Sequence, residues 1–294
     1  MQRLCCVAIL LVMAAPAAAQ KKHGPQVLIP GEGWRVAAED FKAVHGLAAD
    51  REGNIFIADT EGKHLTRIST DGQVKGVTMN EPGLYGLALG PDDRLYASQP
   101  DKHRIIAREA DGKLAVVATD VTAHDLVVTR DGTIYCTVPD DKAVYLVSPG
   151  GKKEPAARDL TEPAGLVLWP DQGTLVAGQA NGSRLWAYRI AKDSSLTDKE
   201  DYYPLRGRSG QSPSGLGALT VDGEGWVYAA TGVGVQVFDP TGRLGTVILK
   251  PEDVPLTALT FGGANHDRLY VAYGPRIYAR KTAARGGVPD KSER

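Results

Sequence analysis

Cysteine and unbalanced charge are both scarce in this sequence. Only three cysteines occur among 294 residues. Basic residues number 34 and acidic residues 35, with no long run of either sign. Because a nucleic-acid surface needs clustered basic residues, this balance argues against a nucleic-acid partner.

The apolar run at the N-terminus is too short to cross a membrane comfortably. Arg3 precedes a run from Leu4 to Met13, and small residues follow at positions 17–19. This order is typical of a secretory signal peptide. We therefore predict a signal peptide at residues 1–19, cleaved after Ala19. The mature protein is expected in the periplasm or outside the cell, without a membrane partner.

Loss of residues 1–19 would also remove Cys5 and Cys6 and leave Cys136 alone. An internal disulfide is then excluded, so the stability of the mature chain must come from its core. Cys136 lies in the strand-like segment TIYCTV, where a buried thiol is expected.

What the sequence has in abundance is a repeat of about forty residues. Each copy opens on an apolar segment such as GLALG, passes a turn rich in glycine and acidic residues, and continues with alternating strands. All steps between copies are 39 or 40 residues except one of 53, and the copies begin at His45, Tyr85, His124, Ala164, Gly217 and Thr257. A fixed period of this length with a strand pattern predicts propeller blades.

The sequence thus predicts an all-β fold, a six-bladed β-propeller with four-stranded blades. The last copy supplies only three strands, while WRVAAEDF at residues 34–41 alternates like a strand. We predict that this N-terminal strand completes the sixth blade and closes the ring, which leaves only short, protected edges. The predicted organisation is a signal peptide at 1–19, a flexible leader at 20–33, the propeller at 34–287 and a flexible tail at 288–294.

The step of 53 residues contains one sizeable insertion, at residues 191–216. Its segment DYYPLR is predicted to be the outer strand of the fourth blade. The segment GRSGQSPSG is predicted to be a loop over the channel mouth where the inner strands begin. Tyr203 and Arg206 make this insertion a candidate lid that contacts substrate. The alternative is a solvated loop without a ligand.

Several phrases resemble the gluconolactonase/senescence-marker-protein (regucalcin) family in order and spacing. They include GLALGPDDRLYASQ, HDLVVTRDGTIY and AGLVLWPDQGTLVAG, and the similarity extends over about residues 34–287. The resemblance implies a six-bladed propeller that holds one divalent metal in its channel and hydrolyses sugar lactones. It also implies that the metal ligands, one Glu, two Asn and one Asp, stand where inner strands begin.

At those positions this sequence departs from the family. His45 stands at the Glu position, His124 and Ala164 at the two Asn positions, and Gly217 at the Asp position. Tyr85 replaces a second-blade Asn that often lies near substrate in the family. A hard cation such as calcium takes several oxygen ligands, and Ala164 and Gly217 have no side-chain donor. The metal-dependent mechanism is therefore not expected in its usual form.

Two histidines replace two of these ligands, and both are predicted to point into the channel. Imidazole suits zinc, copper, iron or nickel better than calcium. His45 and His124, completed by Asp125 or water, therefore form one candidate site for a divalent metal of unknown identity. The same histidines are candidates for metal-free base catalysis. The alternative is that both merely line the channel, hydrogen-bonded to backbone or water.

Three functions are compatible with these features. The first is a hydrolase of a sugar lactone or related carboxylic ester, with His45 or His124 as the catalytic residue. In that case Tyr85, Asp125 and the insertion are expected to contact a carbohydrate-like substrate. The second is a non-catalytic propeller that binds a ligand or a protein. The third is a lyase that resembles streptogramin B lyase, another propeller with channel histidines. A monomer is expected in each case.

Overall fold

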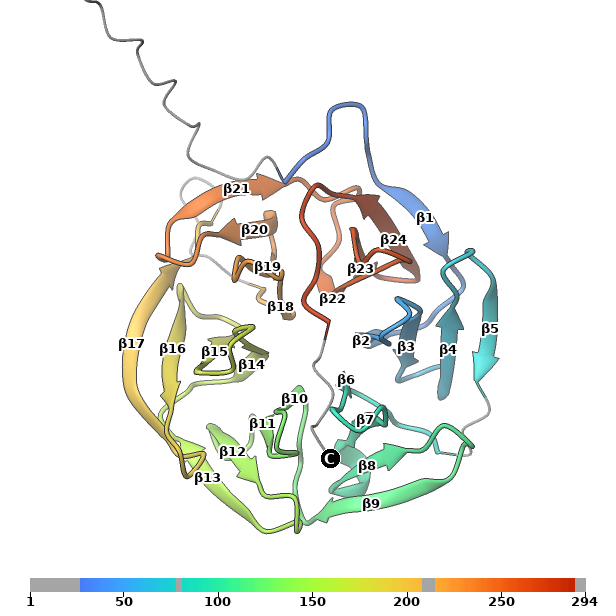
Figure 1. Ribbon diagram of the computed structural model, residues 1–294. Helices are drawn as coiled ribbons and strands as arrows, with labels where there is room; N and C mark the ends of the chain where they lie inside the picture. The colour runs from blue at the N-terminus through green and yellow to red at the C-terminus, as the bar shows by residue number, and fades with distance from the viewer. Residues whose placement is uncertain (1–26, 78–80, 208–214, 289–294) are drawn as a thin grey trace, which may run out of the picture.

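The computed structural model describes residues 27–77, 81–207 and 215–288 of the chain. Six antiparallel sheets of four strands each stand around a central axis like the blades of a propeller (Figure 1). The prediction of an all-β six-bladed propeller is therefore confirmed. The predicted signal peptide and most of the loop GRSGQSPSG lie outside the described residues.

Each blade runs from an inner strand at the channel to an outer strand at the rim. The first blade consists of β2 (Val44–Ala49), β3 (Ile55–Asp59), β4 (His64–Ile68) and β5 (Val74–Val77). The second consists of β6 (Leu87–Leu89), β7 (Leu95–Gln99), β8 (Arg104–Arg108) and β9 (Leu114–Thr119). The third consists of β10 (Leu126–Val128), β11 (Ile134–Val138), β12 (Ala143–Val147) and β13 (Lys153–Ala157). The fourth blade consists of β14 (Pro163–Leu168), β15 (Thr174–Gln179), β16 (Arg184–Ile190) and β17 (Leu196–Pro204). The fifth consists of β18 (Leu219–Val221), β19 (Val227–Thr231), β20 (Gly234–Phe238) and β21 (Leu244–Ile248). The sixth consists of β22 (Leu256–Gly262), β23 (Arg268–Tyr273), β24 (Arg276–Lys281) and the N-terminal strand β1 (Arg35–Ala38).

Within the described parts of the chain, the single helical turn is η1 (Pro100–Lys102), between β7 and β8. No helix among these residues is long and apolar enough to span a membrane.

The N-terminal strand closes the ring, as predicted. β1 pairs antiparallel with β24, with Arg35 opposite Ala279. The attachment begins earlier than the sequence suggested, because Val27 is only 2% exposed and Leu28 bridges to Thr282. These two apolar residues pack against the core around the fifth and sixth blades. The part of the expected flexible leader that the structure describes is therefore held against the propeller.

The core is formed where neighbouring blades pack face to face. Middle strands such as β7, β11 and β19 are buried at every residue, which explains their apolar composition. One cluster joins Ile105 of the second blade to Leu126 and Cys136 of the third. Cys136 is fully buried, as predicted, and burial raises the pKa of its thiol to about 12. This thiol is a packing residue, not a reactive one.

Residues 282–288, which follow β24, run to the centre of the ring at the end of the channel opposite to the inner-strand starts (Figure 1). Gly286 donates its N–H to the carbonyl of His266, and Gly223 donates to the carbonyl of Arg285. His266 occupies a turn, where an exposed side chain would be expected. It is nevertheless only 8% exposed, and its Nε2 lies 3.0 Å from the carbonyl oxygen of Arg51.

Glycines let neighbouring blades approach closely at the mouth of the channel. A Cβ on Gly46 would overlap the carbonyl oxygen of Tyr85 on the next blade. A Cβ on Gly86 would likewise overlap the carbonyl oxygen of His124, which accepts the N–H of Gly86 at 3.1 Å. Contact between backbones at this position therefore fixes the spacing of the inner strands.

We predict that Gly46→Ala lowers the free energy of unfolding by about 1–3 kcal/mol, because the added methyl group has to displace backbone. The matched control is Gly76→Ala on the outer strand β5, where nothing lies within 4 Å of the added Cβ. That change should be neutral or stabilising, since alanine restricts the unfolded chain. Denaturant unfolding of both variants is the measurement. Equal stabilities would contradict the proposed role of the close contact.

Candidate functional site

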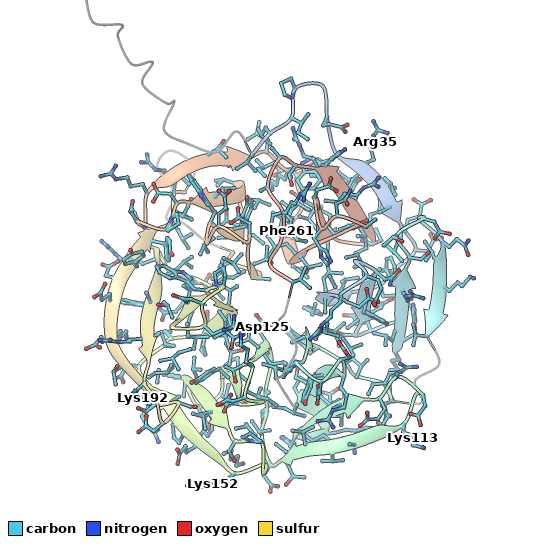
Figure 2. The ribbon with its side chains drawn as sticks, viewed as in Figure 1. Arg35, Lys113, Asp125, Lys152, Lys192 and Phe261 are labelled. Atoms are coloured by element: carbon cyan, nitrogen blue, oxygen red, sulfur yellow. The ribbon has the colours of Figure 1, made fainter. Side chains whose placement is uncertain are left out.

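Two adjacent cavities lie along the axis of the propeller. The mouth cavity, of about 390 Å³, lies where the inner strands begin, and the channel cavity, of about 420 Å³, continues between the strands. His45, Asp125 and Ala218 line both of them. Figure 2 shows Asp125 near the centre of the ring. These three residues therefore lie between the two cavities and border both.

Three aromatic rings from successive blades form a stack at the mouth. The ring centroids of His45 and Tyr85 are 4.3 Å apart, with an interplanar angle of 18°. The centroids of Tyr85 and His124 are 4.6 Å apart, with an angle of 38°. Tyr85 comes from the blade between the two histidines, so its ring lies between the imidazoles. The imidazole of His45 is stacked on the tyrosine ring, and the imidazole of His124 is tilted against it.

The hydrogen bonds around His45 determine its tautomer. The hydroxyl of Thr60 donates to the carbonyl oxygen of Leu84 at 2.7 Å. Its oxygen lies 3.2 Å from Nδ1 of His45 and, with its proton already engaged, can only accept there. Nδ1 must then carry the proton, which leaves Nε2 as the unprotonated nitrogen. This assignment makes Nε2 a base or a ligand atom.

Both imidazoles are held in their neutral form. Burial, and then the neighbouring His124, lower the pKa of His45 from its usual value. Burial also lowers the pKa of His124, against the opposing effect of Asp140. Burial followed by the charge of Asp125 raises the pKa of Tyr85, so its hydroxyl stays protonated. At neutral pH the stack therefore contains two uncharged bases and one hydroxyl donor.

Asp125 connects the third blade to the fourth. Its Oδ2 accepts the N–H of Leu166 at 2.9 Å, and its Oδ1 accepts the N–H of Leu126 at 2.9 Å. Burial raises the pKa of this carboxyl to about 6, although both hydrogen bonds favour the charged form. Asp125 is thus a structural link that also changes its charge close to neutral pH.

The donors at the mouth do not fit a calcium-type ion. Ala164 and Gly217 line the cavity without side-chain donors, and the oxygens of Asp125 already accept backbone N–H groups. Across the described residues there is no group of three or more His, Cys, Asp or Glu arranged to hold a metal. A softer metal shared by His45 and His124 would need the ring of Tyr85 to leave its place. That two-histidine site stays a prediction.

The structure brings His45, Tyr85, His124 and Asp125 together at the mouth, as the sequence suggested. It places Tyr203 and Arg206 elsewhere; neither is among the described residues that line the mouth. Tyr203 is fully buried, and its hydroxyl accepts the indole N–H of Trp169 at 3.1 Å.

Arg206 is exposed, and its backbone N–H and carbonyl are both bound by Gln236. Tyr203 is therefore a core residue, which argues against its predicted contact with substrate, whereas substrate contact by Arg206 stays a prediction. Tyr203 lies on the outer strand β17 and packs against Phe238 of the next blade.

Two residues of the site were not among the candidates taken from the sequence. Thr60 follows β3 and orients His45. Thr257 begins the inner segment of the sixth blade, lines the mouth, and has a buried hydroxyl with no partner among the described residues. Thr257 opens the sixth copy of the repeat, so its register was a usable signal, whereas only its neighbours in space identify Thr60.

Comparison with solved structures places the fold among known six-bladed proteins. The structure of a gluconolactonase from Xanthomonas campestris superposes with a TM-score of 0.75 at 22% identity, over 88% of this chain and 94% of that chain. The calcium-binding protein regucalcin from Agrobacterium tumefaciens strain C58 gives 0.74 at 18% identity, over 90% and 98%. Streptogramin B lyase gives 0.63 at 13% identity, over 85% and 98%. At these identities the similarity concerns the fold.

The sequence comparisons are more specific. A gluconolactonase from Zymomonas mobilis is 22% identical over 213 residues, which are 62% of this chain. The match spans 58% of that curated relative's length. The family model for the SMP-30/Gluconolactonase/LRE-like region matches residues 74–274, more than half of the chain. This protein therefore belongs to the SMP-30/gluconolactonase/LRE-like family.

Proposed function

We propose that the protein hydrolyses a lactone or a related carboxylic ester at the channel mouth, with His45 as the general base. The observation that carries the proposal is the hydrogen bond from Nδ1–H of His45 to the hydroxyl of Thr60, which leaves Nε2 unprotonated on a residue that lines both cavities. A lowered pKa keeps this nitrogen available at neutral pH. Membership of the family supports this class of reaction.

In this reaction Nε2 of His45 accepts a proton from a water molecule while the water oxygen bonds to the substrate carbonyl carbon. The tetrahedral intermediate then collapses, and the bond from carbon to the ring oxygen breaks. The protonated His45 returns its proton to the departing alkoxide. The product is a hydroxy acid, which loses a proton to solvent at neutral pH. One water is consumed, and the imidazole ends in its starting form.

Two hydroxyls at the mouth are candidates to stabilise the developing oxyanion. Tyr85 keeps its proton because its pKa is raised. The buried hydroxyl of Thr257 has no partner among the described residues, and such an orphan donor is unfavourable unless water or a ligand completes it. Donors aimed at the carbonyl oxygen would supply part of the activation that a metal provides elsewhere.

We also propose that the protein acts after export, as the sequence of residues 1–19 suggests. The non-catalytic binding module and the lyase are the alternatives against which the hydrolase is tested. A binding module would show ligand-induced stabilisation without turnover. A lyase would form its product without taking up water, which the product mass reveals.

The first test replaces the base. His45→Ala should lower kcat for hydrolysis at least about 100-fold, because a positioned general base contributes about 10²–10⁴ in rate. His103→Ala is the matched control, since exposed His103 also has Nδ1 near a threonine hydroxyl, that of Thr122 at 3.0 Å. The control should keep its activity. Equal rates in both variants would remove His45 from the mechanism.

The pH dependence of kcat/KM offers a second test of the base. Neutral His45 is the active form, and its pKa lies below the usual value. The rate should therefore rise with pH below 6.5 and level off at neutral pH. Thr60→Val removes the group that accepts the proton of Nδ1. The variant should therefore have a lower kcat, with a smaller change in KM. A rate that falls as the pH rises toward neutral would contradict a neutral imidazole base.

Asp125 generates a prediction about stability. Its pKa is about 6 in the folded protein, above the unfolded value near 3.9, so the folded state binds this proton more tightly. The contribution of Asp125 to the free energy of unfolding should be greatest below about pH 4. It should decrease as the pH rises through about 6, by at most about 3 kcal/mol in total.

Asp125→Asn removes the titration, and its amide oxygen can still accept one N–H. The melting temperature of the variant minus that of the wild type should therefore become more positive as the pH rises from 4 to 8. Thermal unfolding over this range checks it. A difference independent of pH would show that the carboxyl does not change its charge there.

A further inference from the structure

We infer that the mouth takes a lactone or ester whose body is apolar, alkyl or aryl, instead of a polyhydroxylated sugar lactone. This inference rests on the proposed hydrolase function and names the substrate class of the same site. Three observations carry it: the side chains that line the mouth, the hydrogen bonds already made there, and the contacts of the Tyr85 ring with two imidazoles.

The side chains around the mouth are mainly apolar. Among the described residues that line it there is no arginine, lysine, asparagine, glutamine or serine. Those without polar side chains dominate the lining: Pro139, Pro163, Ala164, Gly165, Ala180, Gly215, Leu216, Gly217, Ala218, Pro255 and Leu256. A cavity of this kind suits apolar ligands, with a few polar groups that fix orientation.

Most polar groups at the mouth are already engaged. The oxygens of Asp125 accept two backbone N–H groups. The hydroxyl of fully buried Thr137 accepts the N–H of Asp125 at 2.9 Å. Glu162, on the rim, accepts the side-chain amide of Asn181 at 2.6 Å.

Apart from Oε1 of exposed Glu162, what remains is a small set of polar groups that have no hydrogen-bond partner among the described residues: Nε2 of His45, the hydroxyls of Tyr85 and Thr257, and the ring of His124. In the proposed reaction the attacking water occupies Nε2 of His45, and the substrate carbonyl oxygen occupies the two hydroxyls. The several hydroxyls of a sugar lactone would then enter without enough partners. A buried hydroxyl without a partner opposes binding, whereas apolar groups gain from leaving water.

The aromatic stack removes a second means of binding sugars. A sugar ring is commonly held against the open face of an aromatic side chain, and Tyr85 was the candidate for this contact. Its ring is already stacked on His45 and in tilted contact with His124. These contacts leave less open face for a sugar ring, whereas the hydroxyl suits a carbonyl oxygen.

The test compares six-membered lactones with the purified mature protein. The substrates are glucono-δ-lactone, a δ-lactone with a pentyl side chain, and the aryl lactone dihydrocoumarin, each rate divided by its uncatalysed rate. We expect kcat/KM on this scale to be at least about tenfold higher for the alkyl or aryl lactone, since unpaired polar groups in a site penalise the wrong substrate strongly. Preference for glucono-δ-lactone would overturn the inference while leaving the hydrolase intact.

A variant pair tests the cause of the preference. Ala164→Asn places an amide at the half-buried wall of the mouth and should shift the ratio at least about threefold toward glucono-δ-lactone. Ala110→Asn, at an exposed position in the second blade, should leave the ratio unchanged. An unchanged ratio in both variants would show that the lining does not set the specificity.

If no lactone is hydrolysed, the proposed hydrolase function is wrong. The inference about an apolar ligand can then still be tested by measuring the binding of non-hydrolysable analogues. The corresponding lactams resist hydrolysis and have the same shape. The pentyl δ-lactam should then raise the melting temperature of the protein, and gluconolactam should not. Stabilisation by gluconolactam alone would overturn the apolar assignment independently of catalysis.

Discussion

The close backbone contact between neighbouring inner strands is the constraint on which this structure depends. At Gly46 and Gly86 the carbonyl of the next blade occupies the space that a side chain would need. Because the blades meet here, the residues just before the glycines, His45 and Tyr85, are brought into ring contact. A contact that serves the closure of the ring thus also assembles the site.

The third blade departs from this pattern, and the departure gives it a chemical role. It has Asp125 where the first, second and fourth blades have Gly46, Gly86 and Gly165. The carboxylate reaches across the interface to the N–H of Leu166, so a side-chain hydrogen bond replaces backbone contact. The same burial raises its pKa to about 6. Stability of the interface and charge at the mouth are therefore coupled through one residue.

The repeat in the sequence was sufficient to predict the fold and the closing strand, since period and alternation depend on local residues. It also predicted which residues meet at the mouth, because His45, Tyr85 and His124 occupy the same place in successive copies. It could not predict that their rings stack or that Thr60 sets a tautomer, because both depend on distances between blades. Tyr203 was misassigned since an aromatic residue in an insertion looks the same whether it faces a ligand or the core.

The lost ligand oxygens and the aromatic stack are best understood as one change of chemistry. Ala164 and Gly217 remove donors from one side of the mouth, and His45, Tyr85 and His124 fill the other with rings. Both effects lower the polarity of the cavity, and low polarity depresses the pKa of an imidazole. A neutral base near an apolar wall is suited to attack on an uncharged carbonyl. The environment that disfavours a hard cation is thus one that suits the base catalysis proposed for His45.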